Sequence, residues 1–137
     1  MICCAVIDTN VLVSALLSGK DDAATVQVLG KVLTGEITPV YSNVIAKEYR
    51  EVLLRKKLGF SRDLTEYLLS AIEKYGILVD PSPSDITLLD MKDVPFYEAV
   101  LEKRNDNACL VTGNIRHFPK ESFIVTPREL INMLNSK

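Results

Sequence analysis

The sequence has no tryptophan, one histidine and three cysteines, and its formal net charge is only −2 over 137 residues. The cysteines form an odd set without the paired spacing of zinc ligands, which excludes a disulfide framework. No apolar stretch reaches the roughly 18 residues that a membrane span requires, so we expect no membrane association. A net charge near zero gives no general attraction to nucleic acid. A polyanionic substrate would therefore need local basic residues or a metal ion.

The remaining composition is that of a globular protein. Apolar residues make up 47% and charged residues 25% of the chain, which is ordinary for such proteins. The length suits one domain, which we expect to span residues 1–137. The first apolar run has no basic region before it, so a secretory signal is not expected. The cysteines fit small buried apolar side chains in a reducing compartment, and we expect a cytoplasmic protein.

Short apolar runs alternate with amphipathic stretches along the whole chain. The runs predict five strands, at residues 2–7, 37–41, 77–79, 108–111 and 123–125. The other stretches predict helices at about residues 11–17, 23–33, 43–56, 63–75 and 95–104, and from Pro127 onward. Strands that alternate with helices indicate a parallel sheet with helices on both faces. We therefore expect an α/β protein, a three-layer α/β/α sandwich around a five-stranded parallel sheet.

Individual residues predict some boundaries of these elements. Pro39 has no backbone N–H group, so it places its strand toward an edge of the sheet or limits the pairing of that strand. Thr9 or Asn10 fits the N-cap of the first helix, and Ser42 or Asn43 fits that of the third.

A carboxylate lies at the seam between two apolar segments in CCAVIDTNVLVSALL, residues 3–17. This residue, Asp8, follows the first strand, and ligands of open α/β sheets bind outside the carboxyl ends of the strands. Ser42 follows the second strand and Thr112 the fourth, so all three ends are small and polar. The alternative is that Asp8 simply caps the helix after it.

A second carboxylate, Glu48, falls within the apolar arc of the third helix. At 100° per residue, Glu48 lies between Val44 and Val52. An unpaired buried carboxylate is costly, so Glu48 requires a partner or a metal ion. The alternative is a position at the edge of the arc, where Arg55 can form an ordinary ion pair with it.

A third carboxylate, Asp93, comes just before the predicted fifth helix, where it also fits an N-cap. Asp90 is a rival for a functional role there, although a solvated loop position suits it better. Asp8, Glu48 and Asp93 are expected around one end of the sheet, where three acids without several basic partners repel one another. A divalent cation removes this repulsion, and Mg²⁺ or Mn²⁺ prefers oxygen ligands of this kind.

Four stretches of the chain carry a more specific signal: VIDTNVLVSALL (6–17), SNVIAKEYREVL (42–53), KDVPFYEAVLE (92–102) and LVTGNIRHFP (110–119). In this order they cover nearly the whole chain, and together they resemble the PIN-domain ribonucleases that form the toxin half of many prokaryotic toxin–antitoxin pairs. The resemblance implies a single PIN-like domain with an acidic metal site. The activity it implies is Mg²⁺- or Mn²⁺-dependent hydrolysis of RNA phosphodiester bonds by an endoribonuclease, with single-stranded RNA as the expected substrate.

The resemblance also assigns roles to individual positions. It implies that Asp8, Glu48 and Asp93 are the metal-binding and catalytic acids, and that Asn10 and Thr112 support them.

Asn114 lies where many members have a fourth acid, and His117 is another nearby position where some members carry one. An amide oxygen can ligate a metal ion, but more weakly than a carboxylate, so the sequence leaves one or two metal ions open. His117 is also a candidate for RNA contact, as are Arg50 and Arg116. Basic residues near the expected site are Lys47, Arg50, Arg55, Lys92, Arg116 and Lys120.

The resemblance further suggests a homodimer with an apolar groove for an antitoxin segment. Val28 lies off the main apolar stripe of its helix, as does Leu17, which indicates a possible interface. Two other classes with acids at strand ends are excluded. A receiver domain needs a paired acid after the first strand, and a dehalogenase-like phosphatase needs a second Asp at the position of Asn10. The remaining alternative is a PIN-like RNA- or protein-binding module without catalytic activity.

Overall fold

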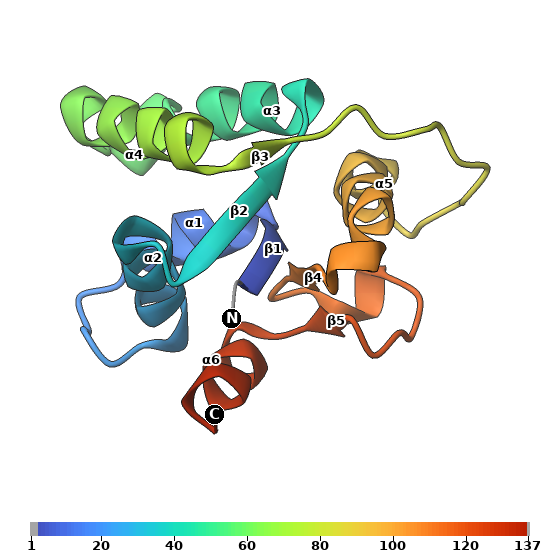
Figure 1. Cartoon of the computed structure of the whole chain (residues 1–137). Helices are drawn as coiled ribbons and strands as arrows, with labels where there is room; N and C mark the ends of the chain where they lie inside the picture. Colours follow the sequence, from blue (N-terminus) through green and yellow to red (C-terminus); the bar gives the residue numbers. More distant parts are fainter. Residues whose placement is uncertain (1–2, 137) are drawn as a thin grey trace.

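A parallel sheet forms the centre of the part of the chain that the computed structural model describes, residues 3–136. Its five strands within that range are ordered β3-β2-β1-β4-β5 (Figure 1). The strands are β1 (Cys3–Ile7), β2 (Ile37–Tyr41), β3 (Ile77–Leu78), β4 (Cys109–Val111) and β5 (Ile124–Val125). The parallel five-stranded sheet confirms the fold that the alternation of apolar runs predicts.

Helices cover both faces of this sheet. The α-helices are α1 (Thr9–Leu17), α2 (Ala24–Thr34), α3 (Asn43–Leu53), α4 (Arg62–Tyr75), α5 (Val94–Glu102) and α6 (Pro127–Asn135). Single 3₁₀ turns are η1 (Lys56–Leu58), η2 (Met91–Asp93), η3 (Arg104–Asp106) and η4 (Ile115–His117). In Figure 1, α1 and α2 lie on one side of β1 and β2, and α5, which packs on β1, β2 and β4, lies on the other. The predicted three-layer arrangement is therefore confirmed.

The central strand β1 explains why the N-terminal run is apolar at successive positions. It pairs with β2 on one side and β4 on the other, and its residues from Cys4 to Ile7 are buried. A strand covered on both faces needs apolar side chains at every position, because neither face meets water. Cys4 and Cys109 are buried, as the sequence predicts.

Pro39 lies in β2, which is an interior strand of the sheet. The prediction that its strand is an edge strand is therefore wrong, and the alternative, limited pairing, holds. On the β1 side Pro39 lies opposite Ala5, whereas β3 pairs only with Val40 and Tyr41. Because proline lacks an N–H group, the short β3 ladder avoids it.

The start of α1 differs from the prediction. The N-cap is Asp8, in an extended conformation, so neither Thr9 nor Asn10 caps the helix. The helix begins one residue after β1 ends, which leaves both of these residues inside the first turn. The cap of α3 agrees with the sequence, since the Ser42 side chain accepts a hydrogen bond from the backbone N–H of Ile45 at 3.3 Å.

Of the two residues on the first two helices that predicted an exposed apolar interface, only one is exposed. Val28 is fully buried, because α2 packs at once against β2, α1 and α6, so the prediction that Val28 lies off the packed face is wrong. Leu17 is 60% exposed at the end of α1. None of the helices between residues 3 and 136 combines the length and hydropathy of a bilayer-spanning helix.

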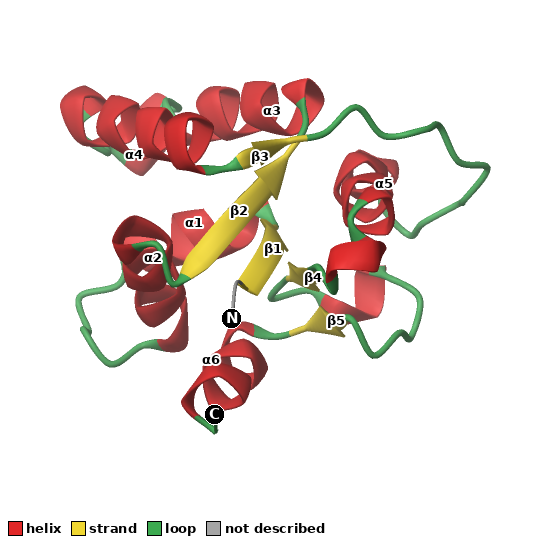
Figure 2. Ribbon diagram, viewed as in Figure 1, coloured by secondary structure: helices red, strands yellow, loops and turns green. Residues whose placement is uncertain are grey.

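A long irregular connection leads from β3 to η2 and α5 (Figure 2). It is anchored by the buried side chains of Val79 and Leu88. This connection leads from the edge strand β3 to α5, which lies on the face of the sheet opposite α1 and α2. It thereby brings the third predicted acid, Asp93, to the end of the sheet where β1 finishes.

Candidate functional site

The candidate site lies where β1 and β4 end side by side. The chain leaves β1 toward β2 on one side, whereas β4 and β5 lie on the other side, so the strand order reverses direction between β1 and β4. Ligands of open α/β sheets bind at such switch points, outside the carboxyl ends of the strands. The N–H of Asp8 donates to the carbonyl oxygen of Val111 at 2.9 Å, which aligns Asp8 with Thr112 on the neighbouring strand.

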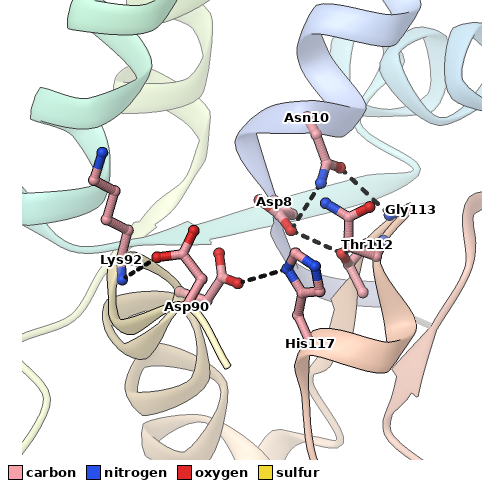
Figure 3. Close-up of polar contacts among 9 residues, drawn as sticks. Asp8, Asn10, Asp90, Lys92, Thr112, Gly113 and His117 are labelled. Carbon is pink, nitrogen blue, oxygen red and sulfur yellow. Dashed lines mark hydrogen bonds and ion pairs between the residues drawn. The ribbon is translucent and has the colours of Figure 1, made fainter. Parts of the chain in front are cut away.

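The carboxylate of Asp8 is buried and held by side chains from two segments. Its Oδ2 accepts hydrogen bonds from Thr112 Oγ1 at 2.7 Å and from Asn10 Nδ2 at 3.2 Å (Figure 3). Asn10 Oδ1 in turn accepts from the N–H of Gly113 at 3.3 Å. Asp8 occupies the N-cap position of α1, as the alternative expected, but its side chain makes no capping hydrogen bond and is engaged instead by Thr112 and Asn10.

The surroundings of Asp8 raise the pKa of its carboxyl group above the usual value. Burial raises the pKa of Asp8, the hydrogen bond from Thr112 opposes the rise, and the charge of Asp93 adds to it. Such a group becomes easier to ionise when a cation approaches, because the cation offsets both the lost hydration and the neighbouring charge.

Glu48 reaches the site from α3 and is held by Thr9. Thr9 Oγ1 donates a hydrogen bond to Glu48 Oε2. The next residue on α3, Tyr49, is almost fully buried, and its hydroxyl donates to the carbonyl oxygen of Ile7. Burial, together with the charges of Asp8 and Glu48, raises the pKa of the Tyr49 hydroxyl, so it remains a neutral donor. Thr9 is a site residue that the sequence analysis did not assign.

The position of Glu48 on α3 corrects the helical-arc prediction. The buried face of α3 consists of Ile45, Tyr49 and Leu53, whereas Val44 is 59% exposed. Glu48 therefore lies at the edge of the apolar arc and not inside it. Its expected ion-pair partner at such an edge, Arg55, forms no ion pair with Glu48 among the interactions of residues 3–136.

Asp93 ends η2 and occupies the N-cap position of α5. Its carboxylate does not serve the helix N–H groups but lies 3.2 Å from His117 Nδ1. Burial raises the pKa of Asp93, the contact with His117 opposes the rise, and the charges of Asp90 and Glu48 add to it. The rival residue, Asp90, is exposed and caps η2 by accepting the N–H of Lys92 at 3.0 Å (Figure 3).

All three predicted acids, Asp8, Glu48 and Asp93, line one cleft of about 560 Å³. The cleft is walled by the start of α1, the exposed face of α3 and the turn η2. Its other lining residues are Thr9, Asn10, Val13, Val44, Lys47, Glu51, Val52, Arg55, Asp90 and Lys92. The acids thus share one solvent-filled space at the end of the sheet, and they do not open onto different sides of the molecule.

The donor set suits a hard divalent cation, since carboxylate oxygens are the ligands that Mg²⁺ and Mn²⁺ prefer. Across residues 3–136, however, no three His, Cys, Asp or Glu side chains are already arranged to hold a metal ion. Each acid is instead held by its own donor: Asp8 by Thr112 and Asn10, Glu48 by Thr9, and Asp93 by His117. The chemistry of the site fits a metal ion, and ligation would require these side chains to reorient.

The other predicted residues lie around the cleft in different ways. Asn114 is exposed, and its backbone N–H donates to Thr112 Oγ1 at 2.9 Å, which helps to fix the hydroxyl that holds Asp8. Arg50 forms an ion pair with Glu66 of α4 and is not a lining residue of the cleft.

Arg116 lines a separate pocket of about 400 Å³ beside η4 and β5. The cations of the cleft itself are Lys47, Arg55 and Lys92.

Comparison with known proteins adds one finding. A family model described as PIN domain matches residues 4–116. No curated protein and no solved structure matches the chain. The matched range includes Asp8, Glu48, Asp93 and Asn114 and ends one residue before His117.

Proposed function

The chain belongs to the PIN domain family, whose members are commonly nucleases, and on this basis we propose that it is a metal-dependent endoribonuclease. The proposed reaction is hydrolysis of phosphodiester bonds in single-stranded RNA. The observation that carries the proposal is the convergence of Asp8, Glu48 and Asp93 on one cleft at the carboxyl end of the sheet.

The proposed roles follow from how each side chain is held. Asp8 and Asp93 are assigned as direct ligands of Mg²⁺ or Mn²⁺, because burial raises the pKa of both acids and the charge of Asp93 adds to the rise at Asp8. Glu48 is assigned either as a third ligand or as the acid that orients the attacking water. A bound divalent cation would lower the pKa of that water and neutralise the charge of the scissile phosphate.

The neutral residues around the acids have a positioning role in this proposal. Thr112 and Asn10 fix the orientation of Asp8, and Thr9 fixes that of Glu48. Replacing a residue that orients a metal ligand typically lowers metal affinity or activity about 10- to 100-fold. Asn114 is proposed as a neutral oxygen donor where a fourth acid would lie, which favours one tightly bound metal ion over two.

The finer assignment rests on the resemblance of the four sequence stretches to toxin-type PIN ribonucleases. We include in the proposal that the protein is the toxin of a toxin–antitoxin pair, that it forms a homodimer and that it acts in the cytoplasm. Induced expression in bacterial cells is expected to arrest growth, and the Asp8→Asn variant is expected to leave growth unchanged. Normal growth with active enzyme would contradict the toxin role and leave the ribonuclease activity standing.

A second candidate is a PIN-like module that binds RNA or protein without cutting it. Two observations favour it: Asn114 replaces an acid, and residues 3–136 contain no ready-made arrangement of three metal ligands. The two candidates differ in whether pure protein cleaves RNA.

The deciding experiment incubates pure protein with labelled single-stranded RNA and Mn²⁺, with and without EDTA. We expect cleavage with Mn²⁺ and none with EDTA. Asp8→Asn should abolish cleavage, whereas the matched surface variant Asp21→Asn should cleave as wild type does. Cleavage that survives Asp8→Asn would identify a contaminating nuclease or a different site, and no cleavage by any sample would favour the binding module.

A thermal-shift measurement tests the metal site without relying on activity. A ligand that binds only the folded state stabilises it by about 2.7 kcal/mol at a concentration 100 times its Kd. Mn²⁺ should therefore raise the Tm of wild type and of Asp21→Asn, but not that of Asp8→Asn. Equal shifts in all three proteins would place Mn²⁺ elsewhere on the molecule.

A further inference from the structure

The cationic side chains of the cleft form no ion pair with any of residues 3–136. In the described range 3–136, the basic residues that lie within ion-pair distance of an acid are Lys31, Arg50, Lys103 and His117. Lys47, Arg55 and Lys92 belong to none of these pairs, although acidic residues line the same cleft. Their charges are therefore available to an anionic ligand.

These cations are placed beside the candidate catalytic acids. Lys47 precedes Glu48 on α3, and Lys92 precedes Asp93 in η2, so two walls of the cleft each carry a cation next to an acid. Arg55 lies eight residues beyond Lys47, just past the end of α3. The helical segment from Lys47 to Leu53 alone spans about 9 Å along the wall, and Arg55 follows beyond the end of the helix.

An exposed apolar side chain lies among these charges. Val44 is 59% exposed, and the half-buried Val13 and Val52 line the same cleft. Covering such a surface is favourable by about 25 cal/mol per Å² of apolar area. A nucleic acid that can do so while it also contacts the cations must present phosphates and unstacked bases or sugars together. Single strands present both, whereas a duplex keeps its base faces inside the helix.

From these observations, and given the ribonuclease proposed above, we infer a path for the RNA strand along α3. Lys47, Arg55 and Lys92 contact the phosphates that flank the scissile bond, and Val44 supports a base or ribose beside it. The path excludes Arg50, which is paired with Glu66, and Arg116, which lines the other pocket. These two residues were expected from sequence to contact RNA, and the inference replaces them.

The test compares two triple variants that remove the same number of positive charges. One is Lys47→Gln/Arg55→Gln/Lys92→Gln in the cleft. The other is Arg50→Gln/Arg116→Gln/Lys120→Gln outside it, which serves as the control. Binding of a fluorescein-labelled 12-nucleotide RNA is followed by anisotropy between 20 and 200 mM salt, in EDTA and separately in Ca²⁺. Thermal unfolding of each variant verifies folding.

Each phosphate contact on a single strand contributes about 0.7 to the slope of log K against log salt. The cleft variant should therefore bind at least tenfold more weakly at low salt, with a slope shallower by about 2, and the control should stay near wild type. Equal losses in both variants, or wild-type binding by the cleft variant, would overturn the inference. Absence of any wild-type binding in either buffer would overturn it as well.

The role of Val44 has its own measurement. Wild type should bind the single strand more tightly than the same strand annealed to its complement, and Val44→Ser should narrow this preference several-fold. An unchanged preference would overturn the part of the inference that assigns Val44.

The binding assay also separates this inference from the proposed activity. If wild type binds through the cleft but does not cleave with Mn²⁺, the path stands and the ribonuclease proposal fails. If wild type cleaves and the cleft variant binds and cleaves equally well, the path fails and the ribonuclease proposal stands.

Discussion

The hydroxyl of Tyr49 donates a hydrogen bond to the carbonyl oxygen of Ile7 at 2.5 Å. Tyr49 follows Glu48 on α3, and Ile7 precedes Asp8 at the end of β1. One buried hydrogen bond therefore fixes the distance between the two backbone segments that carry these acids. The ring of Tyr49 also packs near Phe96 of α5, with centroids 6.3 Å apart, which ties the same point to the helix that follows Asp93.

Replacement of Tyr49 by phenylalanine should cost both stability and activity. The ring stays, but the buried carbonyl of Ile7 loses its donor, and an unsatisfied buried polar group costs about 1–3 kcal/mol. Urea denaturation should show this loss, and RNA cleavage should weaken because α3 is no longer fixed to β1. The matched change Tyr67→Phe, on a side chain that is 64% exposed, should leave both unchanged. Unaltered stability of Tyr49→Phe would show that water or another donor replaces the hydroxyl.

Thr9 offers a test of how Glu48 is positioned. Thr9→Val keeps the shape of the side chain but removes the hydroxyl that bonds Glu48 Oε2. Loss of such an orienting partner typically lowers metal affinity or activity about 10- to 100-fold. We expect a fall in kcat or apparent Mn²⁺ affinity in this range with little change in Tm. Thr9→Ser, which retains a hydroxyl, should restore most of the activity. Equal defects in both variants would argue against the hydrogen bond as the cause.

The free energy of unfolding should depend on pH because the pKa of Asp8 is raised in the folded protein. Its pKa is raised above the usual 3.8, mainly by burial, so the folded protein binds this proton more tightly than the unfolded chain does. The contribution of Asp8 to the free energy of unfolding should therefore fall as the pH rises from about 3.8 through the raised pKa of the folded state.

Asp8→Asn removes this penalty while it keeps an oxygen that can accept the hydrogen bond from Thr112. In EDTA at pH 7, denaturant titrations should show Asp8→Asn to be more stable than wild type, and the difference should shrink toward pH 3. The surface variant Asp21→Asn should show no such trend. A variant that becomes less stable relative to wild type as the pH rises would mean that ionised Asp8 is stabilised in the folded protein.

Asn114→Asp should alter metal binding in a defined direction. It places a fourth acid at the position where the resemblance to PIN ribonucleases implies one. Without metal, the added charge should lower the Tm because it increases repulsion near Asp8 and Asp93. With saturating Mn²⁺ the increase in Tm should exceed that of wild type. If the increase is equal in both proteins, residue 114 lies outside the metal environment.

Most of the fold could be predicted because it depends on local patterns. The run from Ile37 to Tyr41 is apolar and bounded by a glycine and a cap residue, and it forms β2 with the expected limits. The helix expected to reach residue 56 ends instead at Leu53. Neither glycine nor proline marks that break, so the local sequence carries no signal for it.

The three acids share one cleft, as expected, and the resemblance already implied Asn10 and Thr112 beside Asp8, but nothing in the sequence indicated the partners of Glu48 and Asp93. The end of the first strand, a property of local sequence, brings Asp8 to the edge of the sheet, whereas helical phase placed Glu48 inside an apolar arc at whose edge it lies. The hydrogen bond from Thr9 to Glu48 joins positions 39 residues apart, and the contact of His117 with Asp93 joins positions 24 residues apart. Such contacts depend on side-chain orientation after packing, for which the sequence has no periodic signal.

The irregular connection between β3 and η2 has a consequence for how this scaffold can diversify. In one wall of the cleft, α3 follows β2 after a single residue, whereas η2 in the opposite wall is reached through an irregular connection and continues into α5, which packs on the sheet. A longer or shorter connection would widen or narrow the opening of the cleft without changing the register of the strands. A protein built on this plan could therefore adapt to differently sized targets by changes in a segment that carries none of Asp8, Glu48 and Asp93.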